Sequence, residues 1–159
     1  MPCYSLCIRL VVPLWLLVML SGCAGEEAVA ARDSLDTRTP IELPAEGRAM
    51  ILSEMRGMLG ALSQFLGGAA ENDTARMRVA ATSAGMKAAV DIDPRISALL
   101  PAEFLELGEG THAAFDSLAM AASGGEKHDV LMGRLSGILG RCVSCHATYR
   151  LEIGSAPTR

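Results

Sequence analysis

The sequence predicts an all-α fold, an antiparallel four-helix bundle. Four stretches bounded by glycine or proline carry apolar residues at spacings of three and four, the period of one face of an α-helix. No stretch shows sustained alternation of apolar and polar residues, so we expect no β-sheet. Helices of this length with short connections favour antiparallel neighbours in a single bundle.

The N-terminal residues 1–22 have the pattern of a secretory signal peptide. Arg9 precedes an apolar run, residues 10–20, which is shorter than the roughly 20 residues that a membrane-spanning helix needs. The run ends in Leu-Ser-Gly-Cys23, which resembles the lipobox of bacterial lipoproteins. That resemblance implies that Cys23 carries lipid and becomes the mature N-terminus. An ordinary signal peptide cleaved nearby is the alternative.

Residues 23–43 mix charged and small residues with a proline and show no clear period, which indicates a flexible tether. The domain is then expected to span residues 44–155. Its first helix opens at Pro44, a favoured first-turn residue, and ends at Gly67-Gly68. Its apolar stripe consists of Leu52, Met55, Leu59, Leu62 and Leu66.

The second helix is expected to begin after Asn72 or Asp73, both of which are good N-cap residues. The third opens at Pro101 and ends at Gly124-Gly125, and a loop containing Pro94 precedes it. The stripe of the second helix consists of Met77, Ala81, Ala84 and Ala88, and that of the third of Phe104, Leu107, Thr111, Ala114 and Leu118.

The fourth helix is expected from about Lys127 to Ile153. Its stripe consists of Leu131, Leu135, Ile138, Cys142, Cys145 and Tyr149. Both thiols should therefore point into the bundle, and His146, one turn beyond Cys142, borders the same face.

The motif Cys142-Val-Ser-Cys145-His146 has the spacing of covalent haem attachment. Two thiols can add to two vinyl groups on one porphyrin edge, and the adjacent imidazole can reach the iron. A structural zinc site would need four protein ligands, which only His112 and His128 could complete. A redox dithiol would need a strand-loop-helix setting, which this sequence lacks. We therefore expect one covalent haem c.

The composition agrees with a bulky cofactor and excludes some partners. The formal net charge is −4 with no basic run, so a nucleic-acid partner is not expected. Aromatic residues make up only 4% of the chain, and a core built from small side chains would pack poorly without a large apolar group. Glycines at 133, 137 and 140 share one helix face, which suggests close approach of the haem edge, another helix or a second subunit of a homodimer.

A helical bundle that ends in this motif followed by Tyr149-Arg150 resembles the class II cytochromes c, which include cytochrome c-prime and its low-spin relatives with a methionine ligand. The segment from Arg48 to Met55 resembles that family's haem-facing first helix. The resemblance covers about residues 44–153, although family members usually lack a lipobox and tether. It implies thioether bonds from Cys142 and Cys145, and His146 as proximal iron ligand.

The same resemblance leaves the other contacts of the haem open. Arg150 would pair with a propionate or tune the histidine, and Arg48 would meet a propionate. The alternative for each is a solvated surface cation. Met55 would fill the sixth iron position, or an apolar wall around Leu52 would leave it open. Met58 is less well placed. His112 is expected to be a partly exposed histidine and not a ligand.

These features together favour a periplasmic, lipid-anchored cytochrome that carries single electrons to redox partner proteins, and not an enzyme. Ala24 follows Cys23 in place of the aspartate that retains lipoproteins at the inner membrane, which favours the outer membrane. One alternative is a five-coordinate haem protein that binds nitric oxide or another small gas. Another is a haem-free lipoprotein with a structural or zinc-binding role.

Overall fold

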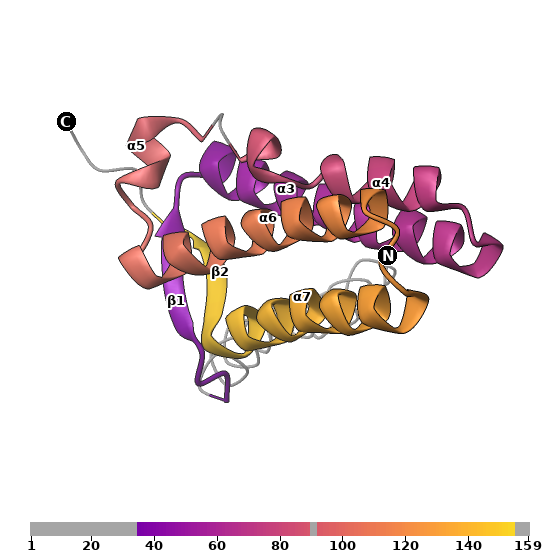
Figure 1. The fold of residues 1–159 in the computed structure, drawn as a ribbon. Coiled ribbons are helices and arrows are strands. Elements are labelled where there is room, and N and C mark those ends of the chain that lie inside the picture. The colour runs from indigo at the N-terminus through magenta and orange to yellow at the C-terminus, as the bar shows by residue number, and fades with distance from the viewer. Residues whose placement is uncertain (1–34, 90–91, 155–159) are drawn as a thin grey trace, which may run out of the picture. The chain divides into compact units, whose positions relative to one another are not determined.

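The computed structural model describes residues 35–89 and 92–154 of the chain. The compact unit that begins at Arg38 contains β1 (Thr39–Leu43), α3 (Ala45–Glu71), α4 (Thr74–Thr82), the 3₁₀ turn η1 (Met86–Ala88), α5 (Pro94–Ser97), α6 (Ala102–Ser123), α7 (His128–Thr148) and β2 (Tyr149–Ile153) (Figure 1). This part of the chain is mostly helical, as predicted. The predicted signal peptide and Cys23 lie outside the described residues.

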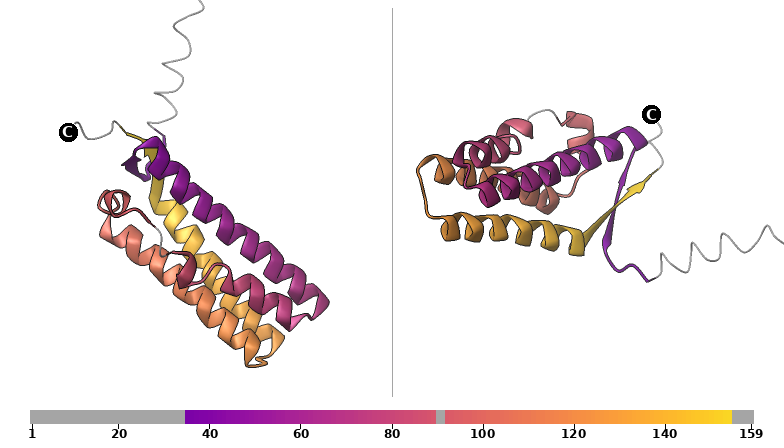
Figure 2. Two further views of the ribbon diagram at one scale, coloured as in Figure 1. Left: turned by 90° about the horizontal axis from the view of Figure 1, so that it is seen from above. Right: turned by 90° about the vertical axis from the view of Figure 1, so that its right-hand side faces the viewer.

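The long helices pack in the order in which they follow one another. α3 packs against α4, α4 against α6, and α6 against α7. Figures 1 and 2 show that α4 returns along α3 and that α7 returns along α6. Within residues 35–89 and 92–154, no helix is both long enough and apolar enough to cross a membrane.

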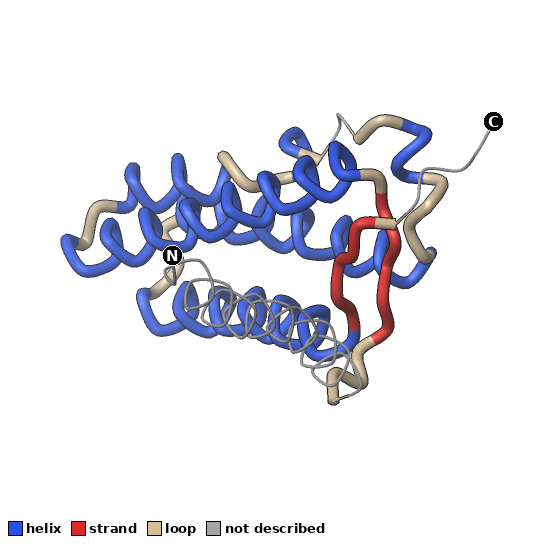
Figure 3. The backbone as a smooth tube through the Cα atoms, turned by 180° about the vertical axis from the view of Figure 1, so that it is seen from behind, coloured by secondary structure: helices blue, strands red, loops and turns tan. Residues whose placement is uncertain are grey.

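A two-stranded parallel sheet, which the sequence did not lead us to expect, lies at one end of the helices (Figure 3). β1 and β2 pair from Thr39 with Tyr149 to Leu43 with Ile153, and the Gly154 N–H donates to Leu43 O at 3.0 Å. The expectation of no sheet was therefore wrong. Each strand has only five residues, and the short alternation of apolar and polar residues in Ile41-Glu42-Leu43 and in Tyr149 to Ile153 was not recognised as a strand pattern.

The same sheet corrects two predicted boundaries. Ile41 and Leu43, placed in the flexible tether, are 3% and 0% exposed, so residues 39–43 belong to the folded domain. The last helix was predicted to reach Ile153, but α7 ends at Thr148, and Tyr149 is extended with φ −121° and ψ 151°. Its ring meets Phe104 edge-on, with the ring centroids 5.6 Å apart.

α3 also continues past the glycines that were predicted to end it. Gly67 and Gly68 lie inside the helix, which ends at Asn72 in the left-handed conformation with φ 54°. A Cβ on Gly68 would lie 3.0 Å from the backbone nitrogen of Met77, so this glycine lets α4 approach α3 closely. Asp73 caps α4 as predicted, because its side chain accepts a hydrogen bond from the Arg76 N–H.

The buried side chains form two clusters. One fills the space between α3, α4, α6 and α7, and its largest fully buried members are Phe65, Phe115, Leu118, Leu131 and Ile138. The other lies by the sheet and consists of Ile41, Leu43, Ile51, Ile96, Leu100 and Phe104. Met55, Cys145 and Tyr149 pack against this second cluster, which brings the start of α3 and the end of α7 together.

The glycine face of α7 meets no other helix. A side-chain carbon added at Gly133, Gly137 or Gly140 would lie more than 4 Å from any neighbouring atom of the described chain. Among residues 35–89 and 92–154, no other helix approaches these glycines closely, so that explanation for the three glycines was wrong. The haem edge and a second subunit stay as predictions.

Candidate functional site

A cavity of about 670 Å³ lies between α3, α6 and α7. Most of its lining is apolar and consists of aliphatic side chains, Phe104 and thioethers, and its volume is within the range of about 300–1,000 Å³ that is typical of small-molecule sites. Cys142, Cys145 and His146 line it from α7, and Met55 lines it from α3. Four of the predicted site residues thus share one cavity.

Most of the apolar stripe predicted on the first helix faces this cavity, and only Leu62 also packs in the closed core. Leu52, Met55, Leu59 and Leu62 all line it, yet Leu59 is 66% exposed. The residues of α3 that pack in the closed core are Ala61, Leu62, Phe65 and Ala69, with Ile51 in the cluster by the sheet. The stripe is apolar as predicted, but most of its side chains face the cavity.

Both cysteines are half-buried free thiols. Burial raises the pKa of the Cys142 thiol. Burial, and then the neighbouring Cys142, raise the pKa of Cys145. A catalytic dithiol needs a thiol with a lowered pKa, because the thiolate is the attacking form. Both thiols lie within α7 and not at a strand-loop-helix junction, which is the setting of the redox dithiol that the motif left open.

The zinc alternative also lacks ligands. In the residues described, no three His, Cys, Asp or Glu side chains gather closely enough to hold a metal ion. His128 is the first residue of α7, and a helix rise of 1.5 Å per residue places it about 20 Å from Cys142. His112 is engaged elsewhere, because both of its ring nitrogens have hydrogen-bond partners.

His112 is buried, so the expectation of a partly exposed side chain was wrong. It is 3% exposed, its Nδ1 lies 2.8 Å from Ala84 O, and its Nε2 lies 3.0 Å from Glu54 Oε1. The carbonyl can only accept, and an ionised carboxylate can only accept, so both hydrogen bonds require the doubly protonated ring. The hydrogen bond that His112 Nε2–H donates to Glu54 is the main cause that raises the pKa of His112. Both side chains line the cavity.

The two arginines predicted to meet a propionate lie at the sheet. The Arg48 Nε–H donates to Leu151 O at 3.1 Å. Arg150 belongs to β2 and pairs with Glu152, with 2.9 Å between Nη1 and Oε1, so it is not one helical turn beyond His146. Neither arginine lines the cavity.

The cavity also contains residues that the sequence did not single out. Arg56 and Arg141 line it, and so does Met86 of η1. Arg141 directly precedes the cysteine motif, and Arg56 directly follows Met55. That proximity to predicted site residues is the signal that could have identified both arginines. Met86 could not have been found in this way, because it lies in a turn remote from every motif.

Comparisons with known proteins give no further guide to the family. No family model matches this chain, and neither the curated proteins nor the solved structures include a match.

Proposed function

We propose that this chain is a lipid-anchored c-type cytochrome, an antiparallel four-helix bundle that carries single electrons between redox partner proteins. The observation that supports it most directly is the shared cavity. Cys142, Cys145 and His146 line one wall, and the helix face with Met55 lines another. A site for haem c needs these groups around an apolar space large enough for a porphyrin.

In this proposal the thiols of Cys142 and Cys145 attach the cofactor. Each S–H would add across one vinyl C=C bond, so that a C–S bond would form and the hydrogen would go to the neighbouring vinyl carbon. The reaction has no leaving group and no net oxidation. Thiols whose pKa is raised by burial remain protonated at neutral pH, so each retains the hydrogen that this addition uses.

His146 would supply the proximal imidazole, since it lies in the last turn of α7 and lines the cavity. Met55 would supply the thioether of the sixth position. When bound, the haem iron would provide a one-electron couple between its ferric and ferrous states. An imidazole and a thioether that are held by two packed helices would move little on reduction, which favours rapid electron transfer.

The exposed apolar lining supports an occupant of this size. Leu59 is 66% exposed and Leu139 is 43% exposed, and both line the cavity. Contiguous apolar surface of this kind usually marks a binding site. A porphyrin would cover these side chains and remove them from water, which stabilises the complex by roughly 25 cal/mol for each Å² buried.

The membrane attachment rests on the sequence alone. The lipobox that ends at Cys23 places a lipid on the mature N-terminus, and an exported chain meets the enzymes of haem ligation outside the cytoplasm. Replacing Cys23 by serine should release the protein from membrane fractions or block its processing. A wild-type protein that carries no lipid mass would contradict this part of the proposal.

The function can be tested by the absorption spectrum of the ferrous protein, made in a host with haem-ligation machinery. We expect the sharp bands of a low-spin c-type haem that remain with the polypeptide after denaturation in acid. The Cys142→Ser, Cys145→Ser double variant should lose the haem on the same treatment. A wild-type protein without any haem spectrum would contradict the proposal and favour a haem-free lipoprotein.

A further inference from the structure

We infer that Arg56 and Arg141 receive the carboxylates of a tetrapyrrole dicarboxylate at the rim of the cavity. This inference rests on the proposed haem function and adds the residues that orient the cofactor. It replaces Arg48 and Arg150, which lie at the sheet, with two cations that belong to the cavity itself.

Three polar side chains of the cavity wall have hydrogen-bond partners within the protein. Glu54 and His112 pair with each other, and the Thr111 hydroxyl donates to Leu107 O at 2.7 Å. The guanidinium groups of Arg56 and Arg141 differ from these. In the part of the chain that the structure describes, neither has an ion pair with another side chain.

The two arginines come from different helices and lie at the solvent side of the cavity. Arg56 is on α3 and Arg141 is on α7, and both side chains are exposed. Arg141 extends toward α6, where its Nη1 would lie 3.0 Å from a Cβ added at Gly110; Gly110 and Arg141 both line a second, neighbouring pocket between α6 and α7, so Arg141 stands at the border of the two. A glycine at that position leaves room for the guanidinium beside the helix.

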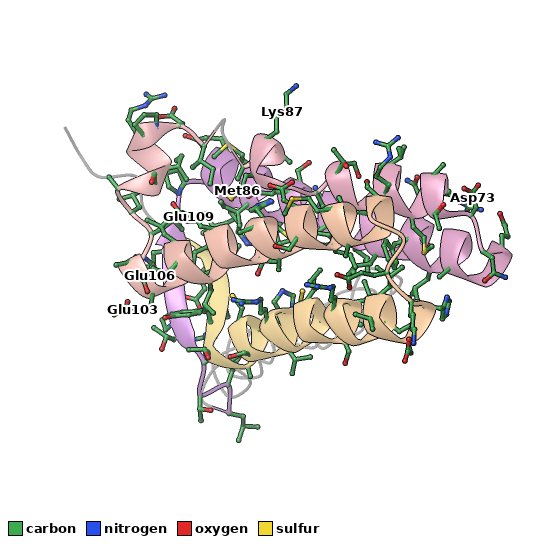
Figure 4. All side chains as sticks on the ribbon, viewed as in Figure 1. Asp73, Met86, Lys87, Glu103, Glu106 and Glu109 are labelled. Carbon is green, nitrogen blue, oxygen red and sulfur yellow. The ribbon has the colours of Figure 1, made fainter. Side chains whose placement is uncertain are left out.

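The chemistry of the cavity determines which end of an amphiphilic ligand faces outward. An ionised carboxylate loses its hydration if it enters an aliphatic interior, so it stays at the rim where water and cations are available. A guanidinium is the side chain that best matches a carboxylate, since it can donate two parallel hydrogen bonds. Glu109, which Figure 4 labels on α6, also lines the cavity, so the two arginines outnumber one unpaired acid there.

A neutral lipid or a gas would gain nothing from these two cations, whereas a porphyrin with two carboxylates would. The experiment uses the full mature chain with Cys142→Ser and Cys145→Ser, so that a bound porphyrin can exchange. Haemin and haemin dimethyl ester are titrated into this protein and into versions that also carry Arg56→Gln, Arg141→Gln or both. Arg78→Gln, an exposed arginine of α4 that does not line the cavity, is the matched control.

We expect each cavity arginine variant to weaken haemin binding by about two- to five-fold, as for a rim ion pair. Binding of the dimethyl ester should not change, and Arg78→Gln should affect neither ligand. Circular dichroism melting would confirm that all variants fold. Equal losses for haemin and its ester, or no loss for haemin, would overturn the inference and leave the proposed function intact.

A second measurement applies if the serine variant retains neither porphyrin. In protein with covalent haem, Arg56→Gln and Arg141→Gln should each lower the midpoint reduction potential, because a nearby cation favours the state with the extra electron. Arg78→Gln should leave the potential unchanged. Potentials that do not differ from wild type would overturn the inference. A chain that acquires no covalent haem and binds no haemin would contradict the proposed function itself.

Discussion

His112 Nε2 lies 3.0 Å from Glu54 Oε1 in the wall of the cavity, and the other nitrogen of the ring lies 2.8 Å from Ala84 O. The imidazole thereby links α6 to α3 and to the segment that follows α4. With an exposed fraction of 3%, the ring would be costly to bury without both partners. The pair therefore contributes to stability in a way that depends on protonation.

The first prediction concerns pH. The pKa of His112 is raised by Glu54, so the folded state holds the proton more tightly than the unfolded state does. This contribution to stability is fully present below the unfolded pKa of about 6.5 and is lost as pH rises through the folded pKa. We expect the free energy of unfolding, measured with urea, to decrease above about pH 6.5 for this reason.

The Glu54→Gln variant tests the assignment to this pair. It should lower the free energy of unfolding by about 1–3 kcal/mol at pH 6, and the loss should shrink as pH rises to 8.5. Glu71→Gln, which removes a partner from the exposed ion pair with Arg76, should cost less than about 1 kcal/mol. A loss that is the same at both pH values would assign it to packing and not to the charge of His112.

The second prediction concerns β1, which the sequence placed in a tether. Leu43 is 0% exposed, so Leu43→Ala should lower the free energy of unfolding by about 2–5 kcal/mol. Leu66→Ala provides the matched control, because that leucine is 48% exposed on α3 and should cost far less. If urea unfolding gave equal values for the two variants, residues 39–43 would not be part of the folded domain.

The third prediction uses two glycines of α3 with opposite surroundings. A Cβ on Gly68 would press on the backbone of Met77 at 3.0 Å, whereas a Cβ on Gly57 would meet nothing within 4 Å. Gly57→Ala should therefore stabilise the protein by up to about 1 kcal/mol through helix propensity. Gly68→Ala should destabilise it by about 1–3 kcal/mol through overpacking. Melting temperatures that shift in the same direction would contradict this account of how α4 approaches α3.

The fourth prediction concerns the sixth iron position. Met55 and Met58 both line the cavity, but Met55 packs with the cluster by the sheet that also contacts Cys145, whereas Met58 packs with the other cluster. Met55→Ala should therefore raise the spin state of the haem and admit carbon monoxide, and Met58→Ala should do little. A high-spin wild-type protein that binds carbon monoxide readily would make Leu52 part of an open distal wall, and the function would change to gas binding.

The helices were predictable because their information is local. As the sequence indicated, α6 begins after Pro101 and ends at Gly124, and Asp73 caps α4. Each of these residues acts through its own backbone or an adjacent turn. Gly67 and Gly68 misled the prediction, because their function is to permit contact with α4. That reason lies in packing between helices, which the local sequence does not reveal.

The sheet and the buried histidine were missed because their partners are distant in the sequence. Thr39 pairs with Tyr149 across most of the domain, and His112 bonds Glu54 and Ala84 from two other segments. A single-sequence pattern carries no sign of such pairings. The cysteine motif needed no distant partner to be noticed, and the cavity brings it to the helix face of Met55.

The most direct test of the account is the intact mass of the mature chain, produced in a host that ligates haem to exported proteins. We predict the mass of the polypeptide with its lipid plus one haem, and loss of that haem in the Cys142→Ser, Cys145→Ser variant. If the wild-type protein from that host had a mass without the added haem, that result would contradict the central claim.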